Sequence, residues 1–319
     1  MTTALHDTSN LYKKLKAGEF VITAELSPPK VPDLSRLDKH LAHYRVGVDA
    51  INVLDMPSAT LRMSSIGTAI YVKQQGLEPV MQMTCRDRSK LGMQGDLISA
   101  YAHGIRNILC LTGDYVTFGD HPMSKPVYDM DSTNAIMMVN QLRKLGKSYG
   151  GGVIADSAKE DPFKMQWCIG AAGNPAGNKP EHLARVMAKK AAAGVDFIQT
   201  QPVFDLDVFD QWWTALDKAG VHNHVKILPG ILPPRSHKGL AFMMQHVPGI
   251  WVPPQVEERI CNATDQKQEA LDVALETMRV LKERYAIAGF HLYPLAWTEN
   301  VPYILGELGL LPKAPVAQA

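Results

Sequence analysis

Two carboxylates stand where a strand-forming run of residues ends. Glu25 closes "FVITAEL" (20–26), after which the chain turns at two prolines, and Asp114 follows "NILCLTG" (107–113). A carboxylate among apolar neighbours is partly removed from water, which disfavours its charged form and suits a general acid near neutral pH. Asp114 could cap a turn or place negative charge near a cofactor, and the residues alone do not separate these roles.

Other polar residues stand at the same end of further predicted strands. With the two carboxylates, the set comprises Glu25, Asp55, Gln82, Thr84, Thr112, Asp114, Asn174, Gln201 and Tyr293. Any single member could cap a helix or satisfy a buried backbone group. Because the whole set falls at one end of successive strands, we expect it to form one site.

Several common site motifs are missing. The chain has no GxGxxG after its first predicted strand and no GxxxxGK[ST], HExxH or GxSxG, so the usual nucleotide, metal and serine-nucleophile signals are absent. Its four cysteines, Cys85, Cys110, Cys168 and Cys261, are far apart and form no CxxC pair. They are predicted to be reduced, buried small hydrophobic residues in a cytoplasmic protein, with no metal role.

The elements that would carry these residues follow one repeated pattern of strand, turn and amphipathic helix. The eight predicted strands read as near-continuous apolar runs, which is typical of a parallel sheet covered by helices. Eight such units in 319 residues predict a (β/α)8 TIM-type barrel in one domain, and a doubly wound open sheet with a small second domain is the competitor. The strands are expected at 20–26, 49–55, 79–85, 107–113, 165–172, 196–201, 225–231 and 289–295.

Two segments depart from the rhythm. The long loop 114–131 follows a strand, which in a barrel places it on the catalytic face, whereas the Gly-rich segment 146–163 precedes one and has no predicted role. The single domain is expected to span residues 1–319, with frayed ends near 1–9 and 313–319.

Charge and hydropathy do not favour nucleic acid or a membrane as the main partner. The formal net charge is +1, from 33 basic and 32 acidic residues, which does not favour nucleic acid or an anionic membrane. The first 20 residues lack the apolar core of a secretory signal, and no run reaches the roughly 18 apolar residues of a membrane span. We therefore expect a cytoplasmic protein.

Seven motifs, in order, resemble the methylenetetrahydrofolate reductase family, and specifically its flavin-binding catalytic barrel. The resemblance covers about residues 10–312 and implies a short, bacterial-type member that consists of the barrel only. The motifs are "TAELSPPK", "MQMTCRDR", "LCLTGD", "GAAGNP", "AAGVDFIQTQPVFD", "PGILPP" and "GFHLYPL".

The resemblance implies FAD as cofactor and a ping-pong reaction. A reductant gives hydride to the flavin and leaves, and 5,10-methylenetetrahydrofolate then takes the hydride to become 5-methyltetrahydrofolate. Glu25 matches the glutamate that protonates the folate near N10 and so opens its ring. Asp114 matches an aspartate that tunes the flavin and orients the substrate, and Gln201 matches a glutamine that contacts folate and nicotinamide.

The resemblance also implies the binding residues. Catalytic roles are assigned to Glu25 and Asp114, and substrate binding to Gln201, Tyr293 and His237. Cofactor binding is assigned to Gln82, Thr84, Thr112, Gly113, Asp114, Tyr128, Asn174, Lys189 and Lys190. The two lysines match a basic pair that contacts the flavin diphosphate, although lysines late in a helix also complement its dipole without any ligand.

Departures from the family pattern leave the electron donor open. Gln82 replaces a flavin-contacting histidine, Leu54 a threonine and Asn174 a tyrosine, while Pro202–Val203 replaces an aromatic pair and His237 a phenylalanine. The donor could be NADH, NADPH or an electron-transfer partner protein in a larger complex. A folate-binding or methyl-transferring barrel without redox chemistry is a remote alternative, and a homo-oligomer is a weak further expectation.

Overall fold

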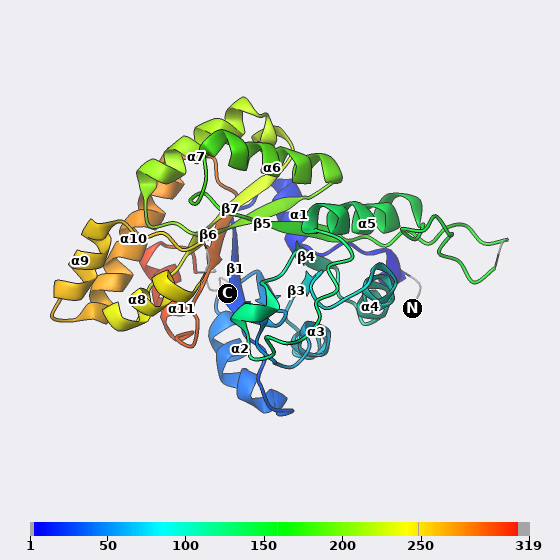
Figure 1. Cartoon of the computed structure of the whole chain (residues 1–319), viewed down its shortest axis with the longest axis horizontal. Helices are drawn as coiled ribbons and strands as arrows, with labels where there is room; N and C mark the ends of the chain where they lie inside the picture. Colours follow the sequence, from blue (N-terminus) through cyan, green and yellow to red (C-terminus); the bar gives the residue numbers. More distant parts are fainter. Residues whose placement is uncertain (1–2, 158, 248, 312–319) are drawn as a thin grey trace, which may run out of the picture.

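Eight parallel strands close into a barrel at the centre of the molecule (Figure 1). This computed structural model describes residues 3–157, 159–247 and 249–311. Each strand pairs with the next, and β1 pairs with β8, so the TIM-type barrel is confirmed and the open sheet is excluded. The strands are β1 (Val21–Leu26), β2 (Ala50–Val53), β3 (Pro79–Thr84), β4 (Asn107–Leu111), β5 (Cys168–Gly173), β6 (Phe197–Pro202), β7 (Lys226–Ile231) and β8 (Gly289–Leu292).

Helices surround the barrel, and their ends follow the signals in the sequence. Pro180 opens α6 in its first turn, and Gly194, with φ of 107°, ends it in the left-handed conformation that glycine adopts freely. The α-helices are α1 (Asn10–Ala17), α2 (Asp38–Tyr44), α3 (Ser65–Gln74), α4 (Lys90–Ala102), α5 (Ser132–Leu145), α6 (Pro180–Ala193), α7 (Leu206–Lys218), α8 (His237–His246), α9 (Pro254–Asn262), α10 (Gln266–Arg284) and α11 (Asn300–Glu307). Short 3₁₀ turns are η1 (Thr3–His6), η2 (Leu34–Leu37), η3 (Pro57–Ala59), η4 (Val116–Phe118) and η5 (Val221–Asn223).

The barrel interior is apolar at its N-terminal end and polar above it. Side chains alternate between the two faces of a strand, so every second residue points inward. The lowest inward layer packs against Leu11 and Leu15 of α1, which closes that end of the barrel. Its members are Val21, Ala50, Val80, Leu109, Cys168, Phe197 and Leu228. Two residues further along their strands lie Thr23, Asn52, Gln199 and His291, which we call the polar layer.

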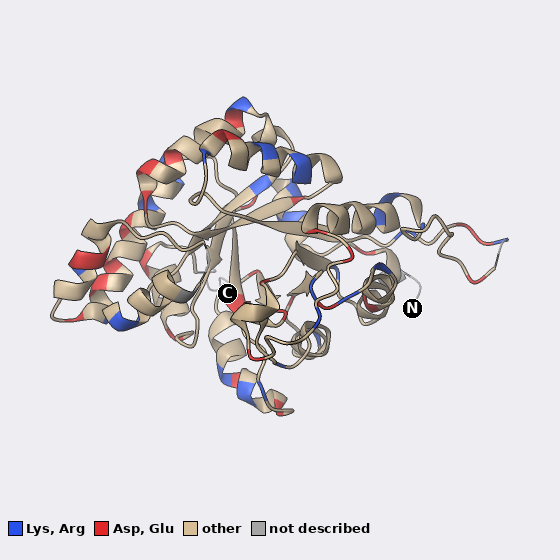
Figure 2. Cartoon of the chain, in the orientation of Figure 1, with Lys and Arg blue, Asp and Glu red and all other residues tan. Residues whose placement is uncertain are grey.

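Charged side chains lie mainly on the outer helices and loops, with both signs interspersed (Figure 2). Within the described part of the chain, no helix is long and apolar enough to cross a membrane. Cys85, Cys110 and Cys168 are buried, as predicted, but the prediction is wrong for Cys261. Cys261 is exposed because it lies in the last turn of the short surface helix α9.

The two irregular segments lie at opposite ends of the barrel. Segment 114–131 follows β4 at the C-terminal end and contains η4. Segment 146–163 precedes β5 and ends at Phe163, whose ring packs 5.9 Å, centroid to centroid, from that of Tyr101 on α4. Of the ends expected to fray, residues 3–9 include η1 and Ser9, which caps α1, while 313–319 lie outside the described residues.

Candidate functional site

Glu25 stands at the C-terminal end of β1 with its side chain 17% exposed. Its Oε1 lies 3.7 Å from Nε2 of His291 on the neighbouring strand β8. The Tyr44 hydroxyl donates to the Glu25 carbonyl at 2.6 Å, which fixes the strand end, and burial followed by the Glu25 charge raises the pKa of Tyr44. The carboxylate is therefore held at the rim while its oxygens stay accessible.

Tyr293 reaches from β8 across β7 to β6. Its hydroxyl donates to the Thr200 carbonyl at 2.8 Å, and burial, together with the Glu25 carboxylate, raises its pKa well above the ordinary value. Gly230 makes this crossing possible, because a Cβ there would lie 2.8 Å from the Tyr293 ring and 2.4 Å from the Thr200 oxygen. The register shift between Gln199 and Pro202 bends β6 at the same place, as bulges near active sites commonly do.

Gln201 and Asn174 meet beneath one loop. A Cβ on Gly249 would lie 2.9 Å from Asn174 Nδ2 and 3.6 Å from Gln201 Cγ, so the loop backbone packs directly on both side chains. The Asn174 oxygen accepts the Ala176 N–H at 3.0 Å. The rim thus brings together Glu25, Tyr293 and Gln201 from β1, β8 and β6, the half of the site assigned to the folate.

Asp114 braces the loop after β2. Its Oδ2 accepts the Ser58 N–H at 2.9 Å, and its carbonyl accepts the Tyr128 hydroxyl at 2.9 Å. The buried guanidinium of Arg86 donates to the same carbonyl and to that of Met56. Gly113, with φ of 93°, lets this segment lie close on β3, since a Cβ there would be 3.0 Å from that of Thr84.

Three other predicted rim residues already have partners within the chain. The fully buried carboxylate of Asp55 accepts the Thr84 N–H at 2.8 Å, the Thr84 hydroxyl and the Arg88 guanidinium. The Thr112 hydroxyl accepts the Ser132 N–H at the start of α5. These contacts join β2, β3 and β4 at the rim, and Gln82 is buried on β3 between them.

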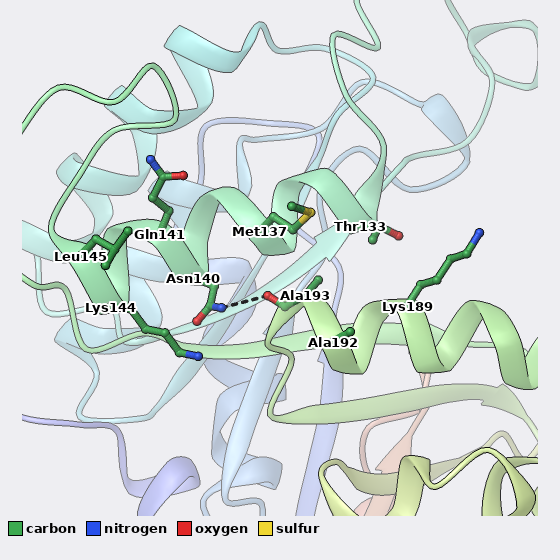
Figure 3. A pocket seen from close by; sticks show the side chains of 9 residues that line it. All are labelled: Thr133, Met137, Asn140, Gln141, Lys144, Leu145, Lys189, Ala192 and Ala193. Atoms are coloured by element: carbon green, nitrogen blue, oxygen red, sulfur yellow. Dashed lines mark hydrogen bonds between the residues drawn. The ribbon is translucent and has the colours of Figure 1, made fainter.

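The two predicted diphosphate lysines point in different directions. Lys190 is buried, its Nζ donates to the Ala172 carbonyl at 2.7 Å, and burial lowers its pKa. Lys189 is exposed and lines a groove of about 580 Å³ between α5 and α6, with Met137 and Asn140 (Figure 3). Because one side chain is buried in the barrel wall and the other faces this groove, the two lysines do not form a basic pair.

His237 begins α8, and its side chain and backbone N–H contact α9 and α10. Its Nε2 lies 3.0 Å from Glu257 Oε1 on α9, and its N–H donates to Gln266 of α10. In the described residues, no group of three His, Cys, Asp or Glu side chains could hold a metal ion.

A family model for methylenetetrahydrofolate reductase matches residues 10–309. The chain belongs to the methylenetetrahydrofolate reductase family. Methylenetetrahydrofolate reductase 1 of Schizosaccharomyces pombe is 25% identical over 249 residues, which are 75% of this chain and 37% of the yeast protein. A probable methylenetetrahydrofolate reductase (NADH) of Oryza sativa subsp. japonica is 23% identical over 314 residues, 95% of this chain and 50% of the plant protein. The chain thus spans half or less of these relatives.

Solved structures share the fold at low identity. An uncharacterized protein from Clostridium thermocellum that binds two copies of 5-methyltetrahydrofolate superimposes with a TM-score of 0.61 at 15% identity, covering 93% of this chain and all of that one. A riboflavin lyase gives a TM-score of 0.54 at 11% identity, covering 93% and 94% of the two chains. These likenesses concern the fold alone.

The polar layer of this methylenetetrahydrofolate reductase family member was not predicted from its sequence. Its four side chains lie directly below Glu25 and hydrogen-bond to one another. The available signal was a polar residue at an inward position inside "FVITAEL", "DAINVLD", "DFIQTQ" and "GFHLYPL". The short, apolar appearance of these runs concealed the alternation.

Proposed function

We propose that the chain catalyses the reduction of 5,10-methylenetetrahydrofolate to 5-methyltetrahydrofolate, with Glu25 as the general acid. The family match over residues 10–309, together with the partly exposed carboxylate of Glu25 at the rim, carries this proposal. Ring opening of the folate needs a proton near N10, and a positioned carboxylic acid in a partly desolvated place supplies one. Tyr293, whose pKa is raised by burial and by the Glu25 charge, and Gln201 are proposed to contact the folate.

FAD is the proposed cofactor, and when bound it supplies the hydride that it takes from NADH or NADPH. The chain's contribution on this side is the loop at Gly113, Asp114 and Tyr128, which would hold the ring system near the carboxylate of Asp114. Lys190 does not fit a diphosphate role, because its ammonium is already bonded to Ala172 inside the barrel wall. We therefore assign it no contact with the cofactor.

The test is an anaerobic stopped-flow comparison of the wild type with Glu25→Gln. The variant should retain bound flavin and its reduction by the donor, while the folate step slows by about 10²- to 10⁴-fold, the usual contribution of general acid catalysis. Glu19→Gln is a matched control, since the exposed Glu19 precedes the opposite end of the same strand. A folate step at the wild-type rate in Glu25→Gln would remove Glu25 from the acid role.

The same experiment distinguishes the electron donors. Bound flavin that is reduced by an artificial donor, but by neither NADH nor NADPH, would point to a partner protein. A preparation that cannot be loaded with FAD, yet still binds 5-methyltetrahydrofolate, would contradict the flavin part of the proposal and leave a folate-binding barrel.

A further inference from the structure

The polar layer is a closed set of hydrogen bonds inside the barrel. The Asn52 amide donates to Gln199 Oε1 at 2.6 Å, and Gln199 Nε2 donates to Asn52 Oδ1 at 3.0 Å. Gln199 Nε2 also donates to Thr23 Oγ1 at 2.9 Å, and that hydroxyl lies 2.9 Å from Nδ1 of His291. All four residues are at most 2% exposed, so water does not compete for these bonds.

The direction of these bonds determines which ring nitrogen of His291 carries the proton. A threonine hydroxyl has one proton to donate. Since Gln199 donates to Thr23, the hydroxyl proton is left for either the Phe290 carbonyl at 3.4 Å or the nearer Nδ1 of His291 at 2.9 Å. Donation to Nδ1 makes that nitrogen an acceptor, so the neutral ring carries its proton on Nε2. Nε2 is the atom that faces Glu25.

We propose that the polar layer holds His291 in the Nε2–H tautomer and aims that N–H at the carboxylate of Glu25, making His291 a positioning residue for the acid. This inference rests on the proposed function. Glu25 becomes negatively charged as its proton moves to the folate, and an oriented donor in a water-poor interior stabilises charge that develops in the reaction. The 3.7 Å separation exceeds a hydrogen bond, so the proposal includes a rotation of the partly exposed Glu25 side chain toward His291.

The layer orients His291 and does not conduct protons. Among the described residues, Thr23 is followed in this set of bonds by the amides of Gln199 and Asn52 alone, and Asn52 is fully buried at its end. The other titratable groups in contact with this pair are Tyr293, whose ring lies edge-on to His291 at 4.7 Å, and Tyr44 on the Glu25 carbonyl. The pKa values of both tyrosines are raised, so both stay neutral at physiological pH. Glu25 is thus the acid that the Nε2–H of His291 faces.

The direct test is ¹⁵N NMR of the full chain labelled in its histidine rings, which reports the tautomer without any turnover. The His291 signals, assigned by their loss in His291→Gln, should show the neutral Nε2–H form. Thr23→Val should disturb that form, whereas Thr23→Ser, which keeps the hydroxyl, should preserve it. If His291→Gln does not fold, signals that change in Thr23→Val but not in Thr23→Ser provide the assignment. A neutral Nδ1–H ring in the wild type would overturn the proposal.

Kinetics provide the second readout. His291→Leu should slow the folate step by about 10- to 100-fold, the range expected for losing a hydrogen bond to a charged group. His291→Gln retains an N–H donor and should recover most of that loss, with unchanged affinity for 5-methyltetrahydrofolate in both variants. A wild-type rate in folded His291→Leu would refute the positioning role. If Glu25→Gln is also fully active, the proposed acid role of Glu25 itself fails, while the tautomer measured by NMR is a separate result.

Discussion

Replacing Asp114 by alanine and, separately, by asparagine distinguishes its bracing role from an electrostatic one. Its carboxylate accepts the Ser58 N–H in a turn where Met56, Ser58 and Ala59 have φ values of 46°, 52° and 53°. Such left-handed conformations cost non-glycine residues about 1–3 kcal/mol each, so the turn persists only because neighbouring groups hold it. Besides Asp114, Arg86 holds it through the Met56 carbonyl.

The size of the effect follows from the exposure of this hydrogen bond. A hydrogen bond to a charged group contributes about 1.5–3 kcal/mol, and water replaces part of it at an exposed site, so the lower end, about 1.5 kcal/mol, applies. That equals about a tenfold change in the local opening equilibrium. Asp114→Ala should therefore speed amide exchange of residues 56–61 about tenfold. Asp114→Asn keeps an acceptor oxygen and should stay within about twofold of the wild type.

Hydrogen exchange by mass spectrometry measures the turn, and anaerobic stopped-flow measures the folate step. If the Asp114 charge also acts on cofactor or substrate, both variants should slow the folate step equally, because both lack the charge. Asp120→Ala is the matched control: this second acid of the loop accepts the Leu61 N–H at 3.0 Å and should loosen the turn without slowing the chemistry. A wild-type folate rate in Asp114→Asn would refute the electrostatic role. Amide exchange of residues 56–61 at the wild-type rate in Asp114→Ala would refute the bracing role.

The barrel could be predicted because each strand is a near-continuous apolar run between turn residues. The errors lie at strand ends and have a common cause. A strand was predicted over residues 49–55, but β2 covers Ala50–Val53 only. The flanking aspartates have partners outside that strand. Asp49 accepts the Ile22 N–H and pairs with Lys14, and Asp55 accepts the Thr84 N–H. Hydropathy gives no information about such side-chain partners.

The candidate site was predictable in its positions but not in its contacts. Thr23 and His291 are 268 residues apart, and closure of β1 onto β8 brings them together, which no local pattern reports. The fate of Lys190 was available in the sequence, because Ala184, Met187 and Lys190 recur at helical spacing on the buried face of α6, while Lys189 lies on the other face. Helical phase therefore separates two lysines that adjacency alone groups as a pair.

Three further predictions concern buried charge and thiols. Asp55→Ala should lower the free energy of unfolding by about 3–5 kcal/mol, as expected for a broken buried ion pair. Asp129→Ala, at the exposed pair with Lys90, should lower it by at most about 1 kcal/mol. Equal losses for the two variants in a denaturant titration would contradict this prediction. Burial lowers the Lys190 pKa, so below pH 10.5 the unfolded chain binds more protons than the folded one. The free energy of unfolding of the wild type should therefore rise relative to that of Lys190→Met as the pH increases toward 10.5. A difference between the two proteins that does not change with pH would argue against a buried cation. One thiol per chain should react rapidly with maleimide, and this rapid labelling should be lost in Cys261→Ser. Burial raises the pKa of Cys85 to about 12 and also protects Cys110 and Cys168. Rapid labelling that remains in Cys261→Ser would place a reactive thiol elsewhere.

The two halves of the rim differ in how they are held. The Glu25 carbonyl is held by Tyr44 of α2, and the carboxylate faces His291 of β8, which is held by the polar-layer residues of β1, β2 and β6. Asp114 is instead held by the loops after β2 and β4 and by Arg86. Among the described residues, no hydrogen bond or ion pair joins the Asp114 loop to the Glu25 carboxylate. Under the proposed function, divergence at Leu54, Gln82 and Asn174 would bear on the electron donor and not on proton donation by Glu25.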